Sequence, residues 1–131
     1  MAVRKVYVTK RASFEAAHHL NNYDGKCSRV HGHSYKLEVT VSGYINPDEV
    51  SDIDFATEAM VCDFTHLKNI IKKVTDIYDH SDLNYYFDQP TAEVMCVYIY
   101  EELKELVDSD CTIECVKLWE TEDSYAEYRG E

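Results

Sequence analysis

The most regular pattern of apolar and polar residues lies between residues 31 and 42. Alternate side chains of a strand point to the same face of a sheet. Here one face would carry only histidine and apolar residues, namely His31, His33, Tyr35, Leu37, Val39 and Val41. The other face would be polar. The pattern predicts a half-buried strand that ends at Gly43 and is followed by a turn at residues 46–48.

A second strand is expected over residues 4–19. Val6 and Val8 alternate with charged or polar neighbours, and Phe14, Ala16 and His18 continue an inward face. We expect a β-bulge near residues 10–13, because the register of the alternation shifts there. Residues 21–25 are rich in turn formers and should form the loop between the two strands.

Two helices are expected in the middle of the chain. Apolar residues recur at helical spacing over residues 67–78, with Asp63 or Thr65 as a possible N-cap. A polar loop over residues 79–84 follows. The second helix should begin at residues 90–93 and continue to Leu106.

The chain closes with two further strands, over residues 111–121 and 125–129. The order of two strands, two helices and two strands predicts one α+β domain over residues 1–131. Its sheet would have four antiparallel strands, with both helices on one face. The acidic segment 48–59 should be an exposed insertion.

Composition narrows the classes of function. The 131 residues include 25 acidic and 13 basic ones, for a net charge of −12, which argues against nucleic acid as a partner. No apolar run reaches the roughly 18 residues of a membrane span, and the N-terminus lacks the apolar core of a signal peptide. The five cysteines form an odd set, which argues against a disulfide framework. We therefore expect a cytoplasmic protein.

The strand pattern also predicts a metal site. His31 and His33 share a face, and His18 would lie opposite them if the two long strands pair. Three neutral imidazoles leave one tetrahedral position open, which is typical of a catalytic zinc ion. The alternative is three ordinary core or surface histidines, but their position on paired strand faces favours Zn²⁺.

Six short motifs are spread over nearly the whole chain: Phe14-Glu15-Ala16-Ala17-His18, His31-Gly32-His33, Asp63-Phe64 with Leu67-Lys68, Asp79-His80 with Leu83-Asn84, Pro90-Thr91-Ala92-Glu93, and Glu120-Thr121. Together they resemble the motifs of the 6-pyruvoyl-tetrahydropterin synthase family. The chain departs from that pattern in the acidic insertion and at Trp119, where many relatives have lysine.

The resemblance implies a particular fold and assembly. The family has the tunnelling fold (T-fold), in which three subunits join their sheets into an oligomeric barrel and two such rings stack. A homohexamer, a dimer of trimers with active sites between subunits, is therefore implied. The 11 tyrosines give an independent hint, because tyrosine is favoured at interfaces.

The spacing Cys27-x3-His31-Gly32-His33 resembles the carboxy-forming branch of the family, which acts in queuosine and 7-deazapurine biosynthesis. The implied substrate is 7,8-dihydroneopterin triphosphate, and the implied products are 6-carboxytetrahydropterin, acetaldehyde and triphosphate. The pyruvoyl-forming branch has a longer gap between cysteine and histidine. A third branch, which forms a hydroxymethyl product, has glutamate in place of the cysteine.

The resemblance also implies catalytic roles. Zinc would be held by the three histidines, Cys27 would accept a proton, and Asp79 with His80 would relay protons. Each assignment has a plain alternative, because a lone cysteine is commonly a small packing residue and Asp-His pairs are frequent in polar loops.

Three further residues are implied to bind the pterin substrate. Glu120 would accept two hydrogen bonds from the ring's amino group and the neighbouring N–H, and would also take part in the proton relay. Thr91 and Glu93 would assist, although they also fit a helix cap. His19 and His66 are expected to be surface residues, and the other four cysteines to be packing residues.

Two rival functions remain from the sequence. The first is the pyruvoyl-forming activity of the same family. The second is a zinc-binding module without turnover. A plain metal hydrolase is disfavoured, because no carboxylate lies next to the histidine motif to serve as a general base for water.

Overall fold

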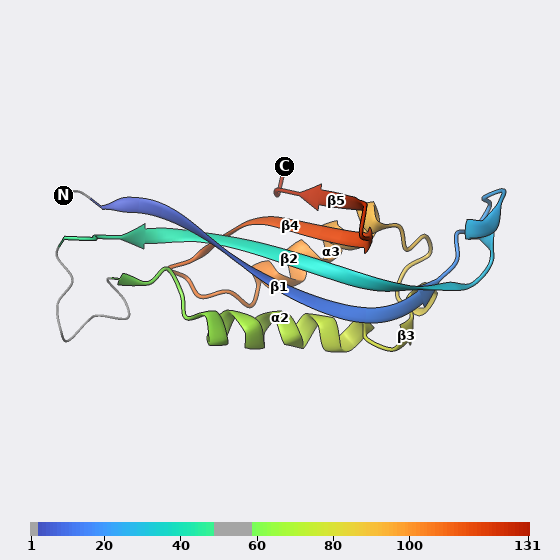
Figure 1. Ribbon diagram of the computed structural model, residues 1–131, viewed down its shortest axis with the longest axis horizontal. Helices are drawn as coiled ribbons and strands as arrows, with labels where there is room; N and C mark the ends of the chain where they lie inside the picture. Colours follow the sequence, from blue (N-terminus) through green and yellow to red (C-terminus); the bar gives the residue numbers. More distant parts are fainter. Residues whose placement is uncertain (1–2, 49–58) are drawn as a thin grey trace.

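The computed structural model describes residues 3–48 and 59–131, with the side chains in these ranges apart from that of Cys27. Two long strands dominate it, β1 (Arg4–His18) and β2 (His31–Ile45). They form an antiparallel hairpin that spans the length of the molecule (Figure 1). Apart from its two end residues, the predicted acidic insertion lies outside the described residues.

The predicted bulge in β1 is wrong. The register runs without a shift from Arg4 opposite Ile45 to His18 opposite His31. Lys10 and Ala12 are both partly buried, so the inward face continues through them. Lys10 can face inward because the aliphatic part of a lysine side chain can lie along apolar neighbours. Its charge makes the alternation of apolar and polar residues look shifted in the sequence, although the strand is regular.

Gly43 does not end β2, which continues to Ile45. A Cβ atom at Gly43 would lie 2.9 Å from Cγ1 of Val61. Glycine is therefore needed inside the strand for a close approach of another segment. The turn predicted at residues 46–48 is present at Pro47 and Asp48.

Over residues 3–48 and 59–131 the sheet has five strands rather than the predicted four, and it is mixed rather than purely antiparallel. Its order is β3-β1-β2-β4-β5, with β4 (Thr112–Thr121) and β5 (Ser124–Tyr128) antiparallel to their neighbours. The added strand, β3 (Ser81–Asp82), pairs in parallel with Ala16 and Ala17 of β1. Two polar residues carry no periodicity, so the sequence pattern predicted only a loop there.

Two helices cover one face of the sheet, as predicted (Figure 1). Helix α2 (Phe64–Tyr78) packs on β1, and α3 (Ala92–Lys104) packs on β4 and β5. The side chain of Asp63 accepts a hydrogen bond from the Thr65 amide at the start of α2. Helix α3 begins in the same way, because the Thr91 hydroxyl accepts from the Val94 amide.

The core lies between this face and the helices. Its most deeply buried members come from β1, β2, β4 and both helices, and include Phe14, Tyr35, Leu37, Val39, Leu67, Ile71, Met95, Ile99, Val116 and Leu118. Phe14 stacks on Tyr35 with ring centroids 4.9 Å apart. His18, only 1% exposed, follows on the same face of β1 and marks the end of the core near the hairpin loop.

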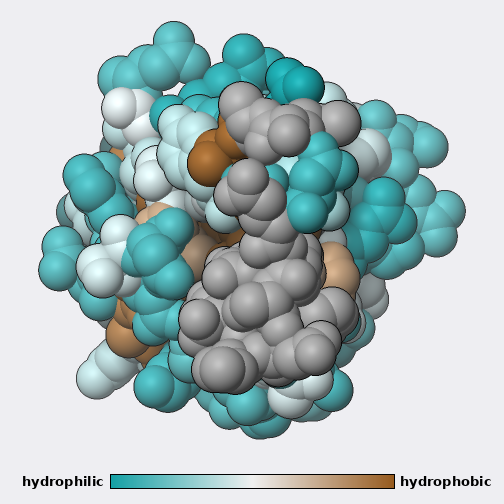
Figure 2. Space-filling model, turned by 90° about the vertical axis from the view of Figure 1, so that its left-hand side faces the viewer, coloured by the Kyte–Doolittle hydropathy of each residue, from teal (hydrophilic) through white to brown (hydrophobic). Residues whose placement is uncertain are grey.

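The described surface is largely hydrophilic at one end of the molecule (Figure 2). At the end of the molecule opposite the hairpin loop, hydrophilic side chains dominate the described surface, and apolar residues occupy small separate areas (Figure 2). None of the described helices is both long enough and apolar enough to cross a bilayer.

Candidate metal centre

Three imidazoles meet where β1 ends and β2 begins. His18 is the last residue of β1 and lies opposite His31, the first residue of β2, while His33 follows two positions later on the same face. The ring centroids are 4.7 Å apart for His18 and His31, 4.9 Å for His18 and His33, and 4.8 Å for His31 and His33. The structure thus brings together the three histidines that the strand pattern singled out.

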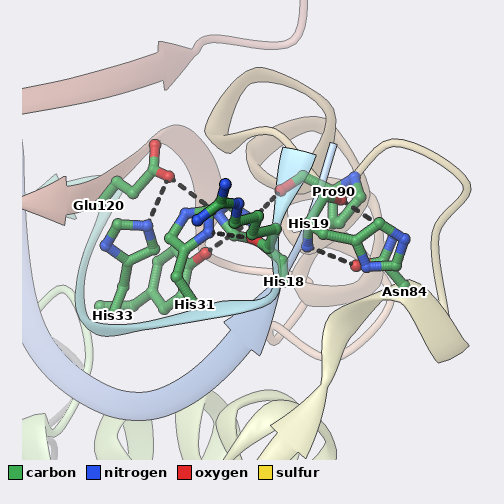
Figure 3. A network of polar contacts seen from close by, with 9 residues as sticks. His18, His19, His31, His33, Asn84, Pro90 and Glu120 are labelled. Atoms are coloured by element: carbon green, nitrogen blue, oxygen red, sulfur yellow. Dashed lines mark hydrogen bonds and ion pairs between the residues drawn. The ribbon is translucent and has the colours of Figure 1, made fainter. Parts of the chain in front are cut away.

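Glu120 of β4 joins the three histidines. Its Oε1 atom lies 3.0 Å from Nε2 of His18 and 2.9 Å from Nε2 of His33. The Nε2 atoms of His18 and His31 are 3.1 Å apart. One ligand atom from each of the four residues falls within 4.8 Å of the others, and Figure 3 shows the carboxylate facing the rings.

The other nitrogens of two rings are bonded to main-chain carbonyls. Nδ1 of His18 lies 2.7 Å from the Pro90 oxygen, and Nδ1 of His31 lies 2.7 Å from the Arg29 oxygen. A carbonyl only accepts, so each Nδ1 must donate its proton. When the two rings are neutral, both Nε2 atoms keep a lone pair directed at the centre, which is the form in which histidine binds a metal ion.

The residues present fit a bound cation. Nε2 of His33 is buried and makes no hydrogen bond within the described residues, although Glu120 lies nearby, because that contact lacks hydrogen-bond geometry. Leaving a buried polar atom unsatisfied costs about 1–3 kcal/mol. A cation at the point where the four ligand atoms converge would satisfy it, and three imidazole nitrogens with a carboxylate oxygen are a donor set that suits zinc.

The electrostatics of the cluster favour the ligating forms of two residues. The hydrogen bond from His18 lowers the pKa of Glu120 and outweighs the opposing effect of burial. Burial lowers the pKa of His33, and the neighbouring His18 and His31 act in the same direction. For His18, burial opposes the charge, but hydrogen bonds to Glu120 and to the Pro90 carbonyl raise its pKa overall.

Asp79 and His80 form a pair at the edge of β1 and are not among the four residues of the cluster. Asp79 Oδ2 lies 3.0 Å from Nδ1 of His80, and its Oδ1 accepts from the Glu15 amide at 2.9 Å, the contact that most lowers its pKa. The His80 side chain is 79% exposed, with φ at +57°. His80 and His33 line the same open pocket of about 470 Å³.

Of the three residues expected to bind substrate, two line one pocket and the third does not. Glu93 lines a pocket of about 430 Å³ together with Glu120 and residues of β5. Thr91 caps α3 through its hydroxyl and is not among the residues that line this pocket. The main chain of Cys27 lies in the short 3-10 helix η1 (Lys26–Ser28) just before β2, and its side chain is outside the description.

Sequence reasoning missed the residues that surround His18. The Pro90 carbonyl and the Tyr35 hydroxyl, which lies 3.2 Å from Nδ1 of His18, gave no signal of their own. His19 was expected to be a surface residue but is partly buried and bonded to Asn84. The available signals were the Leu83-Asn84 motif and the motif that begins at Pro90.

Comparisons with known proteins agree over almost the whole chain. A family model described as 6-pyruvoyl tetrahydropterin synthase matches residues 7–131. The 6-carboxy-5,6,7,8-tetrahydropterin synthase of Haemophilus influenzae is 35% identical, over 93% of this chain and 97% of its own. The dihydroneopterin monophosphate aldolase of Pyrococcus furiosus is 32% identical, over 88% and 90%.

A solved structure is also similar. The 6-pyruvoyl tetrahydropterin synthase of Caenorhabditis elegans superimposes with a TM-score of 0.81 at 27% identity, over 98% of this chain and 97% of that one. The similarity therefore extends through both helices and the sheet.

Removing one imidazole should weaken zinc binding. His31→Ala deletes a nitrogen donor, so the zinc affinity should fall by at least roughly 100-fold, measured by competition with a chromophoric chelator. His66→Ala is the matched control, because His66 is exposed and pairs with Asp108 at 3.1 Å. Equal affinity of His31→Ala and the wild type would contradict the assignment.

Zinc affinity should fall with decreasing pH. Protons compete with the metal for imidazole nitrogen, and the raised pKa of His18 means that this competition begins above the usual histidine value of about 6.5. Glu120, whose pKa is lowered, should stay charged further into the acidic range. Chelator competition from about pH 8 to about pH 5 tests this, and a flat profile would refute it.

Proposed function

Because the chain belongs to the 6-pyruvoyl tetrahydropterin synthase family, we propose that it is a zinc-dependent 6-carboxy-5,6,7,8-tetrahydropterin synthase. It would act as a lyase that converts 7,8-dihydroneopterin triphosphate to 6-carboxytetrahydropterin, acetaldehyde and triphosphate, in queuosine or 7-deazapurine biosynthesis. The observation that carries the proposal is the convergence of His18, His31, His33 and Glu120 on one point, with Nε2 of His33 left without a hydrogen bond.

The choice of reaction within the family rests on two supports. Relatives of similar identity are named for different reactions, so membership alone does not select one. The Cys27-x3-His31 spacing resembles the carboxy-forming branch, and the Haemophilus influenzae relative with that name matches over nearly its full length. Both supports favour the carboxy-forming reaction over the pyruvoyl-forming one.

His18, His31 and His33 would hold the zinc ion. When bound, zinc would act as a Lewis acid that polarises oxygens of the substrate side chain. Glu120 lies beside the three rings and also lines the pocket of about 430 Å³, so its carboxylate could accept the paired N–H donors of a pterin ring there. Glu93 in the same pocket would assist, and Thr91 would act by fixing the start of α3.

Proton transfer would fall to Cys27, Asp79 and His80. Asp79 bonds Nδ1 of His80 and so fixes the ring, which leaves Nε2 free to exchange a proton. Cys27 would accept a proton from the substrate, since a thiolate is more populated near a metal ion or a charged histidine than in water.

The proposed assembly is a homohexamer, a dimer of trimers. Within the described residues, β3 covers Ala16 and Ala17 at the edge of β1, and residues 79–80 bond to Glu15. The edge from Arg4 to Phe14 is therefore free to pair with another strand. Pairing of such edges between copies would close a barrel. The exposed His80 could then serve an active site shared with a neighbouring subunit.

Product analysis tests the proposed reaction. After incubation with 7,8-dihydroneopterin triphosphate, mass spectrometry should detect 6-carboxytetrahydropterin, with acetaldehyde and triphosphate in equal amounts. Pyruvoyltetrahydropterin without acetaldehyde would instead establish the pyruvoyl-forming alternative. Zinc binding without any turnover would establish a non-catalytic module. Dihydroneopterin monophosphate serves as a comparison substrate, because one relative is named for it.

Cys27→Ala should abolish turnover while the zinc content stays the same. Loss of a proton acceptor is expected to lower kcat by roughly 100-fold or more. The matched control is Cys115→Ala, because burial raises the pKa of the Cys115 thiol to about 11 and keeps it protonated. A Cys27→Ala enzyme with wild-type kcat would remove this residue from the mechanism.

A further inference from the structure

Beyond the last residue of β1, the main chain is held by two side-chain carboxamides instead of a strand. Asn84 Oδ1 accepts from the His19 amide at 2.8 Å, and Asn84 Nδ2 donates to the His19 oxygen at 3.0 Å. Gln89 does the same at Asn21, with both distances at 2.6 Å. A carboxamide offers one acceptor and one donor group side by side, as a peptide group does, so each replaces a neighbouring strand.

These bonds continue a ladder that begins inside the sheet. Main-chain groups at alternate residues of an extended chain point to the same edge. Along this edge Glu15 bonds to residues 79–80, Ala17 pairs with β3, and His19 and Asn21 bond to the two carboxamides. Without the last two partners, the chain after His18 would have a free edge, and the end of a strand with a free edge tends to fray.

The two carboxamides hold both ends of the hydrogen bond that orients His18. Asn84 fixes the main chain one residue after His18, and Gln89 directly precedes Pro90, whose carbonyl accepts from Nδ1 of His18 at 2.7 Å. Figure 3 shows Asn84 and His19 on one side of His18 and Glu120 on the other. No polar contact joins Asn84 or Gln89 to the rings of His18, His31 or His33 in the described part of the chain.

We propose that Asn84 and Gln89 are positioning residues of the metal centre, which act by holding the main chain of residues 19–21 so that Nε2 of His18 meets the other ligands. The inference rests on the proposed metal site and explains how the His18 ring is held in position there. We call the hydrogen bonds of Asn84 and Gln89 to residues 19 and 21 the clamp. Ligands held in place before binding lose less entropy when the metal binds, so the clamp should raise the zinc affinity.

The test compares the zinc affinity of purified variants by chelator competition, with Co²⁺ absorption spectra as a second readout of ligand geometry. Asn84→Ala should lower zinc affinity by roughly 10-fold or more and change the Co²⁺ spectrum, and Gln89→Ala should act in the same direction. Asn84→Asp keeps the size of the side chain but sets an oxygen against the His19 carbonyl, so it should also bind zinc more weakly.

Two control variants separate positioning from general destabilisation. Asn69→Ala removes an exposed carboxamide of α2 that makes no polar contact within the described residues. Ile71→Val removes a methyl group from the core, where Ile71 is 0% exposed. Both should keep wild-type zinc affinity, and circular dichroism should confirm that every variant is folded at the temperature of the titration.

A His18→Ala background gives the sharpest outcome. If the clamp acts through His18, Asn84→Ala should cause no further loss of the residual zinc affinity in that background. An equal loss in both backgrounds, or wild-type affinity of Asn84→Ala and Asn84→Asp, would overturn the inference while leaving the metal site intact. A wild-type protein that binds no zinc would instead refute the metal site itself, and the inference with it.

Discussion

The unbroken antiparallel register of β1 and β2 is the constraint on which the rest of the structure depends. A slip of one residue would turn every side chain of one strand to the opposite face. In the observed register Phe14 stacks on Tyr35, with ring centroids 4.9 Å apart, and four residues later His18 lies opposite His31. The same register therefore forms the aromatic part of the core and places the ligands. Core packing and the site are determined together, because the histidines simply extend the apolar face.

A polar cluster at the end of an apolar face is stable only if its buried atoms find partners. Main-chain carbonyls accept hydrogen bonds from Nδ1 of His18 and His31. Burial lowers the pKa of His18, but its hydrogen bond to Glu120 helps to raise that pKa overall. Nε2 of His33 is the exception, since it is buried without a hydrogen bond within the described residues. A cation at the centre would give this atom a partner, which is the physical reason to treat the cluster as a candidate metal site.

Features of this site that depend on neighbouring residues in the sequence were predicted, and features that depend on residues far apart in the sequence were not. The period of two predicted β2 and the shared face of His31 and His33, and the capping residues Asp63 and Thr91 were visible locally. The strand β3 was not, because two residues have no period. The contact of Asn84 with His19 joins residues 65 positions apart, and no local pattern encodes it. The longer strands and the helix caps were therefore predictable from the sequence, whereas the hydrogen bonds that hold the histidines in place depend on tertiary structure.

The proposed chemistry is divided between a face and an edge of the sheet. The three histidines and Glu120 lie on the face that the helices cover, whereas Asp79 and His80 are bonded to the edge of β1 through Glu15, and the His80 side chain is 79% exposed. An acid–base pair so exposed is poorly shielded from water in a single chain. If the free part of the β1 edge pairs with another copy, residues of that copy would lie beside the strand to which Asp79 and His80 are bonded. In the proposed hexamer, the edge that closes the barrel would therefore also bury the proton relay, so assembly and catalysis would depend on the same strand.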